Sequence, residues 1–359
     1  MNVKRKNPFR LILAALFVIV AYFILFPYPL GKELVPKPDW ALSIGADAVP
    51  AAARNAESFA PFQLAGTFGY VDGDGGLVFK GNPLFRVALT DAGFINFTRI
   101  GSTWIFQDIR GNRVFSFSGN GYPVLSRGAE RLFTISTDLT GIREYDTDGE
   151  PLWSRDFPSL ITCLSMQSDY VLAGLLNGSL QLVGRAGEEL VDYAPSGSRI
   201  PVIFGCAVSM DGRRIAAVSG VDGQFLSVLE RQGSDFRPVS LIPLDSDFRS
   251  EIRMEFSPDG RYLVLEGSGS AVVYDCASRR IFTTSLSAGL AGFTFLQKSG
   301  STAFCAWNGS RAELVISKPF ANPFFRESFP AGSVYIGEID GAILLGIDTT
   351  LARIDLEEM

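Results

Sequence analysis

The sequence predicts an all-β fold of seven or eight small sheets, with eight favoured, each built from four short strands. One unit recurs along the chain: an apolar run, a turn containing glycine, and a second apolar run, as in "EFSPDGRYLVLEGSGSAVVYD" at 255–275. The spacing between successive hairpins averages 38 residues, measured from one turn glycine in each: Gly75, Gly111, Gly141, Gly178, Gly223, Gly269, Gly309 and Gly341. A repeat of this length with short strands is typical of a single β-propeller, in which each repeat forms one blade.

The apolar runs indicate strands that are covered on both faces. Residues 262–265 read YLVL and residues 343–345 read ILL, as expected for a blade that packs against a neighbour on each side. Helical repeats are disfavoured, because no 12-residue stretch beyond residue 60 keeps helical periodicity without Gly or Pro. Two short spacings, near Gly141 and Gly341, leave seven blades open as the alternative.

The N-terminus predicts a membrane anchor. A basic tail at residues 1–10 precedes an uncharged apolar run at 11–30, which is long enough as a helix to cross a hydrocarbon core of ~30 Å. Positive charges on this flank favour a cytoplasmic N-terminus. A cleaved signal peptide is the alternative, but no small-x-small cleavage site follows the run. We therefore expect a single-pass signal anchor that contacts the bilayer through residues 11–30, with the remaining chain extracytoplasmic, or periplasmic in a bacterium.

A proline-rich stretch at 31–62 is expected to be a linker, and residues 63–359 are expected to form the propeller. The stretch contains four prolines and one short strand candidate, Trp40 to Ile44. Propellers usually close their ring by pairing a strand from one end of the chain with the blade at the other end. The short strand is therefore expected to become the outer strand of the last blade.

Two turn types resemble those of known propeller families. "FSPDGRYLVLEGSGSAVVYD" and "SMDGRRIAAVSGVDG" resemble blades of the WD-repeat and Tol-type propellers, and "YDTDGEPLW" at 145–153 resembles a quinoprotein (PQQ-type) blade. This resemblance covers about residues 64–357 and implies a propeller fold. The chain contains neither the Gly-His nor the Trp-Asp dipeptide of WD repeats, so their polar network is not expected.

The composition excludes several kinds of site. The chain contains no histidine, which excludes Ser-His-Asp and Cys-His catalysis and histidine-ligated metals. A net charge of −6 without a long basic run argues against nucleic-acid binding. The Asp-rich "VDGDGG" at 71–76 resembles a fragment of a calcium loop but fits a β-turn better. Acid pairs such as Asp245/Asp247 are interpreted as solvated loop carboxylates, so we expect no metal and no cofactor.

Two stretches predict a partner-binding surface. The segment 317–332 combines aromatic rings and an arginine with prolines, which predicts a long loop, and 245–253 is expected to be a second loop. Aromatic residues and arginine dominate protein–protein hot spots. The candidate partner-binding residues are Phe320, Phe324, Phe325, Arg326 and Phe329 in the first segment and Phe248, Arg249 and Arg253 in the second. In the alternative interpretation, the Phe rings fill gaps between blades and the second segment is a solvated turn.

Cysteines offer one further candidate site. Cys163 and Cys206 stand about one repeat apart in runs expected to be innermost strands of adjacent blades. An extracytoplasmic compartment permits a disulfide between them. Two buried, reduced thiols are the alternative, because neighbouring blades rarely meet the ~5.5 Å Cα–Cα separation that a disulfide needs.

These features together predict a membrane-tethered, extracytoplasmic scaffold that binds proteins of the membrane or cell envelope and has no catalytic activity. The alternative is a propeller enzyme, either a quinoprotein-like dehydrogenase or a carboxylate-based hydrolase or lactonase. A central funnel containing several carboxylates with shifted pKa values would favour the enzyme.

Overall fold

The computed structural model describes residues 34–50, 58–126 and 130–358. Residues Pro36–Leu356 form one compact unit, which is the unit described below, and Met1–Val35 with Glu357–Met359 form a separate small one. The predicted basic tail at 1–10 and anchor at 11–30 lie outside the described residues. Within the described ranges, we find no helix with the length and apolar character needed to span a bilayer.

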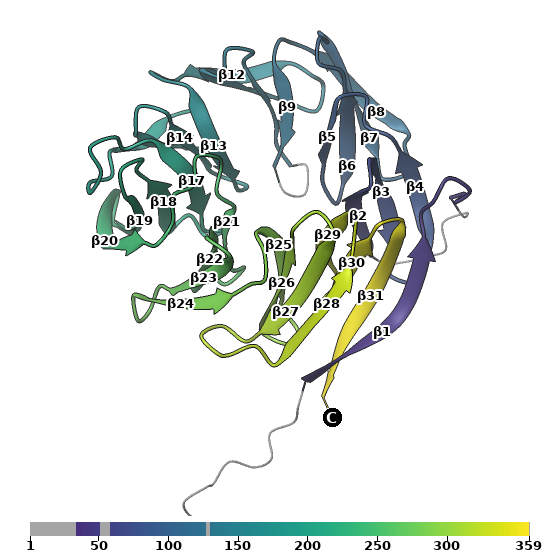
Figure 1. Ribbon diagram of the computed structural model, residues 1–359. Helices are drawn as coiled ribbons and strands as arrows, with labels where there is room; N and C mark the ends of the chain where they lie inside the picture. The colour runs from purple at the N-terminus through teal and green to yellow at the C-terminus, as the bar shows by residue number, and fades with distance from the viewer. Residues whose placement is uncertain (1–33, 51–57, 127–129, 359) are drawn as a thin grey trace, which may run out of the picture. The chain divides into compact units, whose positions relative to one another are not determined.

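The compact unit is an all-β propeller. Eight antiparallel sheets surround a common axis in the described part of the chain, and seven of them have four strands (Figure 1). Eight blades, favoured over seven by the sequence, are therefore confirmed. From the axis outward, the strands of the first four blades are β2 (Phe59–Leu64), β3 (Thr67–Asp72) and β4 (Leu77–Gly81); β5 (Arg86–Leu89), β6 (Gly93–Phe97), β7 (Thr103–Asp108) and β8 (Arg113–Ser118); β9 (Tyr122–Leu125), β10 (Leu132–Ile135), β11 (Gly141–Tyr145) and β12 (Pro151–Asp156); and β13 (Ile161–Met166), β14 (Val171–Leu175), β15 (Leu180–Val183) and β16 (Glu189–Tyr193).

The remaining four blades follow the same plan and are drawn in green to yellow in Figure 1, apart from β1, which is purple. Their strands are β17 (Ile203–Val208), β18 (Arg214–Ser219), β19 (Gln224–Gln232) and β20 (Asp235–Leu244); β21 (Met254–Phe256), β22 (Tyr262–Gly267), β23 (Ser270–Asp275) and β24 (Arg280–Ser285); β25 (Leu290–Leu296), β26 (Ser301–Trp307), β27 (Arg311–Ser317) and β28 (Phe325–Pro330); and β29 (Val334–Ile339), β30 (Ala342–Ile347), β31 (Thr350–Glu358) and β1 (Leu34–Ser43).

The ring is closed by a strand from the other end of the chain. β1 pairs with β31 as the outermost strand of the last blade, and the strand expected at Trp40–Ile44 overlaps its end. The Ile44 amide donates to the Thr349 carbonyl at 2.7 Å, and Arg353 on β31 lies 3.8 Å from Asp39 on β1. β1 and β2 both begin inside the stretch expected to be a linker.

One blade has three strands in the described residues rather than four. Its Asp72–Gly75 turn matches the Asp108–Gly111 turn between the third and outermost strands of the next blade, since each aspartate accepts amide hydrogens from the two residues at i+2 and i+4. β2, β3 and β4 therefore correspond to the second, third and fourth strands of a full blade.

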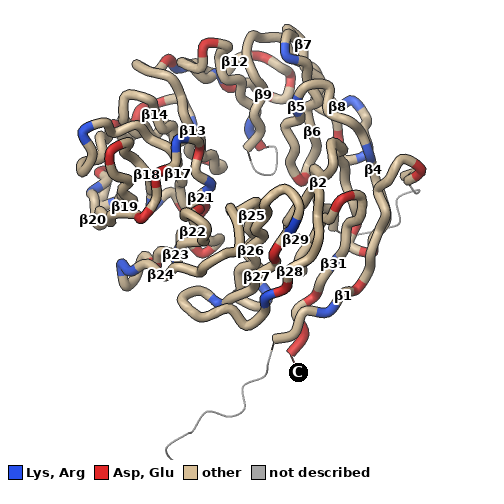
Figure 2. Tube along the Cα trace, viewed as in Figure 1, with Lys and Arg blue, Asp and Glu red and all other residues tan. Residues whose placement is uncertain are grey.

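Strand burial follows position in the blade. β14, β15, β17 and β23 are buried along their whole length, because blades pack on both of their faces. The outer strand β12 instead alternates between exposed and half-buried residues. Basic and acidic residues are interspersed around the ring rather than separated by sign (Figure 2).

Aromatic side chains join consecutive blades at glycine turns. Trp153 on β12 packs over Gly187 of the next blade, where an added Cβ would lie 2.8 Å from the indole, and its Nε1 donates to the Arg185 carbonyl at 3.1 Å. Trp40 packs over Gly75 in the same manner, and its Nε1 donates to Gly73 at 2.9 Å. The Phe79 ring packs on Gly111 and repeats the contact, so three blade junctions share it, whereas Gly149 instead adjoins the backbone and Cβ of Phe117.

The propeller has two faces, which we name here. The cleft face carries the turns between second and third strands, such as 136–140 and 176–179, and the connections between blades, such as 157–160 and 194–202. The channel face carries the turns between first and second strands, such as 209–213, and those between third and outermost strands, such as 318–324. β1 reaches the cleft face at its end, where Ile44 meets Thr349, so Pro36 near its start lies toward the channel face.

Candidate functional site

The cleft face carries a row of exposed apolar side chains. Leu139, Leu160, Leu176 and Ile200, here called the apolar patch, are 39%, 39%, 44% and 52% exposed. The backbone connects them: the Ile161 amide donates to the Leu139 carbonyl and the Leu176 amide to the Leu160 carbonyl, both at 2.8 Å. The turn at Gly178 touches Pro201, the neighbour of Ile200. Contiguous exposed apolar side chains of this kind mark interaction sites.

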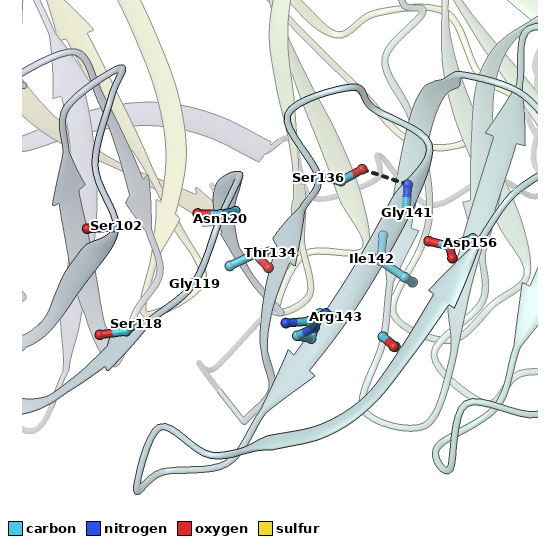
Figure 3. A pocket seen from close by; sticks show the side chains of 11 residues that line it. Ser102, Ser118, Gly119, Asn120, Thr134, Ser136, Gly141, Ile142, Arg143 and Asp156 are labelled. Atoms are coloured by element: carbon cyan, nitrogen blue, oxygen red, sulfur yellow. Dashed lines mark hydrogen bonds between the residues drawn. The ribbon is translucent and has the colours of Figure 1, made fainter.

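A polar cleft opens on the same face, between blades β5–β8 and β9–β12. Its volume is about 560 Å³, within the range of ligand sites. Figure 3 shows Ser102, Ser118 and Asn120 on one wall and Thr134, Arg143 and Asp156 on the other. Leu139 belongs to the turn between the lining residues Ser136 and Gly141, so the cleft and the apolar patch share one face of the propeller.

Strand pairing explains why the second wall is polar. Thr134, Arg143 and Ser154 are cross-strand neighbours on β10, β11 and β12, so their side chains share one face. One row farther along, Leu132 and Tyr145 pair and enter an apolar cluster with Trp104 and Phe117. The blades therefore meet through apolar packing at Tyr145 and separate at Arg143.

Arg143 and Asp156 are the charged groups of the cleft. Both are exposed, and within the described residues neither forms an ion pair or a side-chain hydrogen bond. The neighbouring Glu144 points to the other side of the sheet, where it is buried and ion-paired with Arg131 at 2.6 Å. The cleft thus presents a guanidinium, a carboxylate and several hydroxyl groups, and neither charged group is paired with another described side chain.

A second cavity, of about 600 Å³, lies at the axis toward the channel face. It is lined by first strands and adjacent turns of several blades, with aromatic side chains such as Phe59 and Phe293 and the carboxylates Asp91, Glu255 and Glu338. The Gly341 amide donates to Glu338. Within the described residues, no group of three or more Cys, Asp or Glu side chains is arranged to hold a metal ion.

The predicted partner segment 317–332 is not one long loop, which corrects that expectation. Residues Phe325–Pro330 form β28, paired with β27 from Ile316↔Phe325 to Arg311↔Pro330, because strand pairing satisfies backbone groups that a loop would leave to water. Phe325 and Phe329 pack toward the next blade. Phe320 packs against the Phe282 ring at 5.9 Å.

Arg326 acts as a structural link between blades. Its guanidinium donates to Glu313 at 2.7 Å and to the Ser285 carbonyl of the preceding blade at 2.8 Å. Phe324 is the exposed member of the set, at 39%, and it lies on the channel face. The geometry therefore favours the interpretation that most of these side chains fill the space between blades.

The second predicted segment lies on the cleft face, in the connection between β20 and β21. Phe248 is half-buried against the core of the neighbouring blades. Arg249 is exposed and donates to the carbonyls of Asp247, Phe248 and Val221, which leaves its charge without a carboxylate partner among the described residues. Arg253 donates to Leu290 of the next blade at 2.7 Å.

Cys163 and Cys206 lie on adjacent innermost strands, β13 and β17, in one buried cluster. Both are free thiols in the structure. Burial raises the pKa of the Cys206 thiol well above its usual value, and the neighbouring Cys163 raises it further.

Sequence reasoning missed the cleft residues Arg143 and Asp156. A signal was present: the third strand of this unit reads GIREY, with two consecutive charges, whereas the corresponding strands β15 and β23 read LQLV and SAVVYD. The sequence also indicated the Asp–Gly–aromatic turn once, at 145–153. The structure shows that Trp40 on Gly75 and Phe79 on Gly111 make the same contact at two further junctions.

Comparison with known proteins agrees with this fold. The chain matches, over residues 1–359, the family described as beta-propeller protein, and it belongs to that family, as predicted. An uncharacterized protein of Treponema pallidum (strain Nichols) is 24% identical over 365 residues, which cover 99% of this chain and 96% of the relative.

Solved structures share the architecture at low identity. BamB from Moraxella catarrhalis superposes with a TM-score of 0.60 at 13% identity, over 90% of this chain and 99% of its own. The dihydro-heme d1 dehydrogenase NirN, in complex with DHE, superposes with a TM-score of 0.52 at 16% identity, over 76% of this chain and 63% of its own. Both similarities show a common fold and carry no information on activity.

Proposed function

We propose that this chain is a protein-binding propeller, tethered to the membrane by residues 11–30, which holds a partner of the membrane or cell envelope on its cleft face. The observation that carries the proposal is the apolar patch, Leu139, Leu160, Leu176 and Ile200, which runs along loops of adjacent blades. Rigid blades present such loops in fixed positions, and loops on rigid scaffolds carry recognition. The proposed scaffold has no catalytic role of its own.

The surroundings of the patch support a protein rather than a lipid as its occupant. The four apolar side chains share the cleft face with a polar cleft that carries Arg143, Asp156 and several hydroxyl groups. Protein interfaces combine an apolar centre with polar surroundings in this way.

The test is site-specific photocrosslinking in intact cells. A photoreactive phenylalanine analogue replaces Leu160 or Leu176 in the full chain, and Met210 or Phe324 on the channel face serve as matched controls, because they are similarly exposed. We expect one discrete protein adduct from both cleft-face positions and none from the controls. Adding Leu139→Asp should reduce the adduct at least about 10-fold, since a charge on an apolar contact is costly.

Equal adduct formation from both faces, or formation that Leu139→Asp leaves unchanged, would contradict the proposal. Membrane attachment is tested with the same cells. The full chain should remain in the membrane fraction after alkaline extraction and should be released when residues 11–30 are deleted.

A further inference from the structure

Blades β5–β8 and β9–β12 meet through apolar packing along only part of their facing surfaces. An apolar cluster joins Trp104 and Phe117 to Tyr145, and the cleft begins where that cluster ends. At the cleft, the facing side chains are short and polar or are absent, as at Gly119 and Gly141. The result is an open space of about 560 Å³, larger than the space of about 380 Å³ between blades β17–β20 and β21–β24.

Orphaned polar atoms lie behind the wall of this cleft. Trp104 Nε1 and Tyr145 Oη are buried and have no hydrogen-bond partner in the described residues. Tyr145 Oη lies close to the cleft residue Gly119, where an added Cβ would come within 2.3 Å of it, and Trp104 Nε1 lies near Gly101, 3.7 Å from an added Cβ. Buried polar atoms without a partner are rare in folded proteins, so the wall of the cleft is not fully satisfied by the described residues.

The charges define the chemistry of the ligand. Arg143 offers a fork of donors that suits a carboxylate, flanked across the sheet by the hydroxyls of Thr134 and Ser154. Asp156 lies one row farther toward the mouth, on the strand position that pairs with Gly141, and accepts N–H or O–H groups. A matching ligand therefore carries a carboxylate deep in the cleft and hydrogen-bond donors nearer its mouth.

Two loops beside the cleft carry exposed apolar side chains. Ile100, 94% exposed, stands two residues from the cleft residue Ser102, and Leu139 stands in the turn between the cleft residues Ser136 and Gly141. A small sugar acid has no apolar groups that could pack against these two side chains. A peptide can supply them, because apolar residues flank an acidic one in many chains. A peptide also supplies backbone N–H groups to Asp156.

We propose that the cleft binds an acidic peptide segment of the partner protein, with its carboxylate on Arg143 and apolar neighbours on Ile100 and Leu139. This inference rests on the proposed function and specifies the chemistry of the partner. It makes Arg143 and Asp156 recognition residues whose contribution can be measured separately from that of the apolar patch.

The experiment is selection of random dodecapeptides displayed on phage against the full chain in nanodiscs. We expect enrichment of peptides with Asp or Glu between apolar residues. Arg143→Met should remove the acidic preference and weaken the selected peptides at least about 10-fold by fluorescence polarisation, in line with loss of a charge-assisted bidentate contact. Arg110→Met is the matched control, because Arg110 is an exposed arginine in the 109–112 turn on the channel face, and it should leave binding unchanged.

Other results would overturn the inference. Selected peptides without acids, or acidic peptides that bind Arg143→Met as well as wild type, exclude Arg143 as the anchor. If those peptides are still lost in Leu160→Asp, the proposed function survives and only the cleft assignment fails. Arg143-dependent binding of glucuronate without any peptide enrichment would show that the cleft takes a small sugar acid instead.

Discussion

Residues 143 and 144 show how much one position along a strand changes the role of a charge. Alternate side chains of β11 face opposite blades. Glu144 is buried and accepts two hydrogen bonds from Arg131, at 2.8 and 2.6 Å, beneath a guanidinium that lies 4.8 Å from the Phe133 ring. Arg143 instead faces the open cleft. The Glu144 carboxylate is therefore part of the packing between blades, whereas the Arg143 guanidinium is available for recognition.

The cysteines give the prediction that belongs at this scale. All four are buried and free, and burial raises the pKa of Cys276 to about 11 and of Cys305 to about 12. Because the thiolate is the reactive form, we expect no rapid reaction with Ellman's reagent in native protein at pH 8. In denaturant, where the pKa returns to about 8.5, all four thiols should react. Two reactive thiols in denaturant would instead reveal a disulfide, with Cys163 and Cys206 as the first pair to examine by mass spectrometry.

At the scale of the element, the blade junctions depend on a contact between an aromatic ring and a glycine. Gly187 has φ of +84°, and the Trp153 indole covers it at a distance that leaves no room for a side chain. The aspartate of the turn in the three preceding blades fixes the local backbone by accepting two amide hydrogens, as Asp146 does from Asp148 and Glu150. Turn and ring together position each blade on the next.

Replacing Gly187 by alanine should destabilise the protein in two ways, by straining the backbone and by displacing the Trp153 ring. A left-handed alanine costs about 1–2 kcal/mol, and displacing Trp153 adds about 1–3 kcal/mol, so Gly187→Ala should lower the free energy of unfolding by about 2–5 kcal/mol in urea titrations. Gly300→Ala is the control, because Gly300 has φ of +61° and no atom within 4 Å of an added Cβ. It should show the backbone cost alone. Equal destabilisation by both variants would mean that the ring contributes nothing.

For the whole molecule, stability depends on closing the ring. β1 covers the edge of β31, and Trp40 on β1 reaches across to the next blade. The last blade therefore consists of segments from both ends of the chain, and the propeller has no free first or last blade.

Deleting residues 36–46 from the full chain should open this ring. We expect the free energy of unfolding to fall by more than it does when the half-buried Trp40 alone is removed, because the deletion also exposes the backbone edge of β31. Trp40→Ala, which keeps the strand, should show a smaller loss of stability. The measurement is thermal unfolding followed by circular dichroism, and an unchanged midpoint in the deletion would disprove closure by β1.

The repeated blades were predictable from the sequence. The features that differ from blade to blade, such as the cleft and the inward-facing rings of 325–329, were not. Turn glycines and doubly covered apolar runs such as 262–265 report local backbone and burial, so the blades and their number followed from them. The apolar content of 317–332 was equally visible, but whether Phe325 and Phe329 face solvent or a neighbouring blade depends on strand pairing with β27.

The sequence by itself determined the repeat, its glycine turns and the absence of histidine chemistry, because these depend on residue type and spacing along the chain. Only the tertiary structure decided that Leu139, Leu160, Leu176 and Ile200 adjoin on one face and that Arg143 faces an open cleft. Those relations join residues on different blades, and the side of a sheet that a residue faces is set by register and by what packs against it.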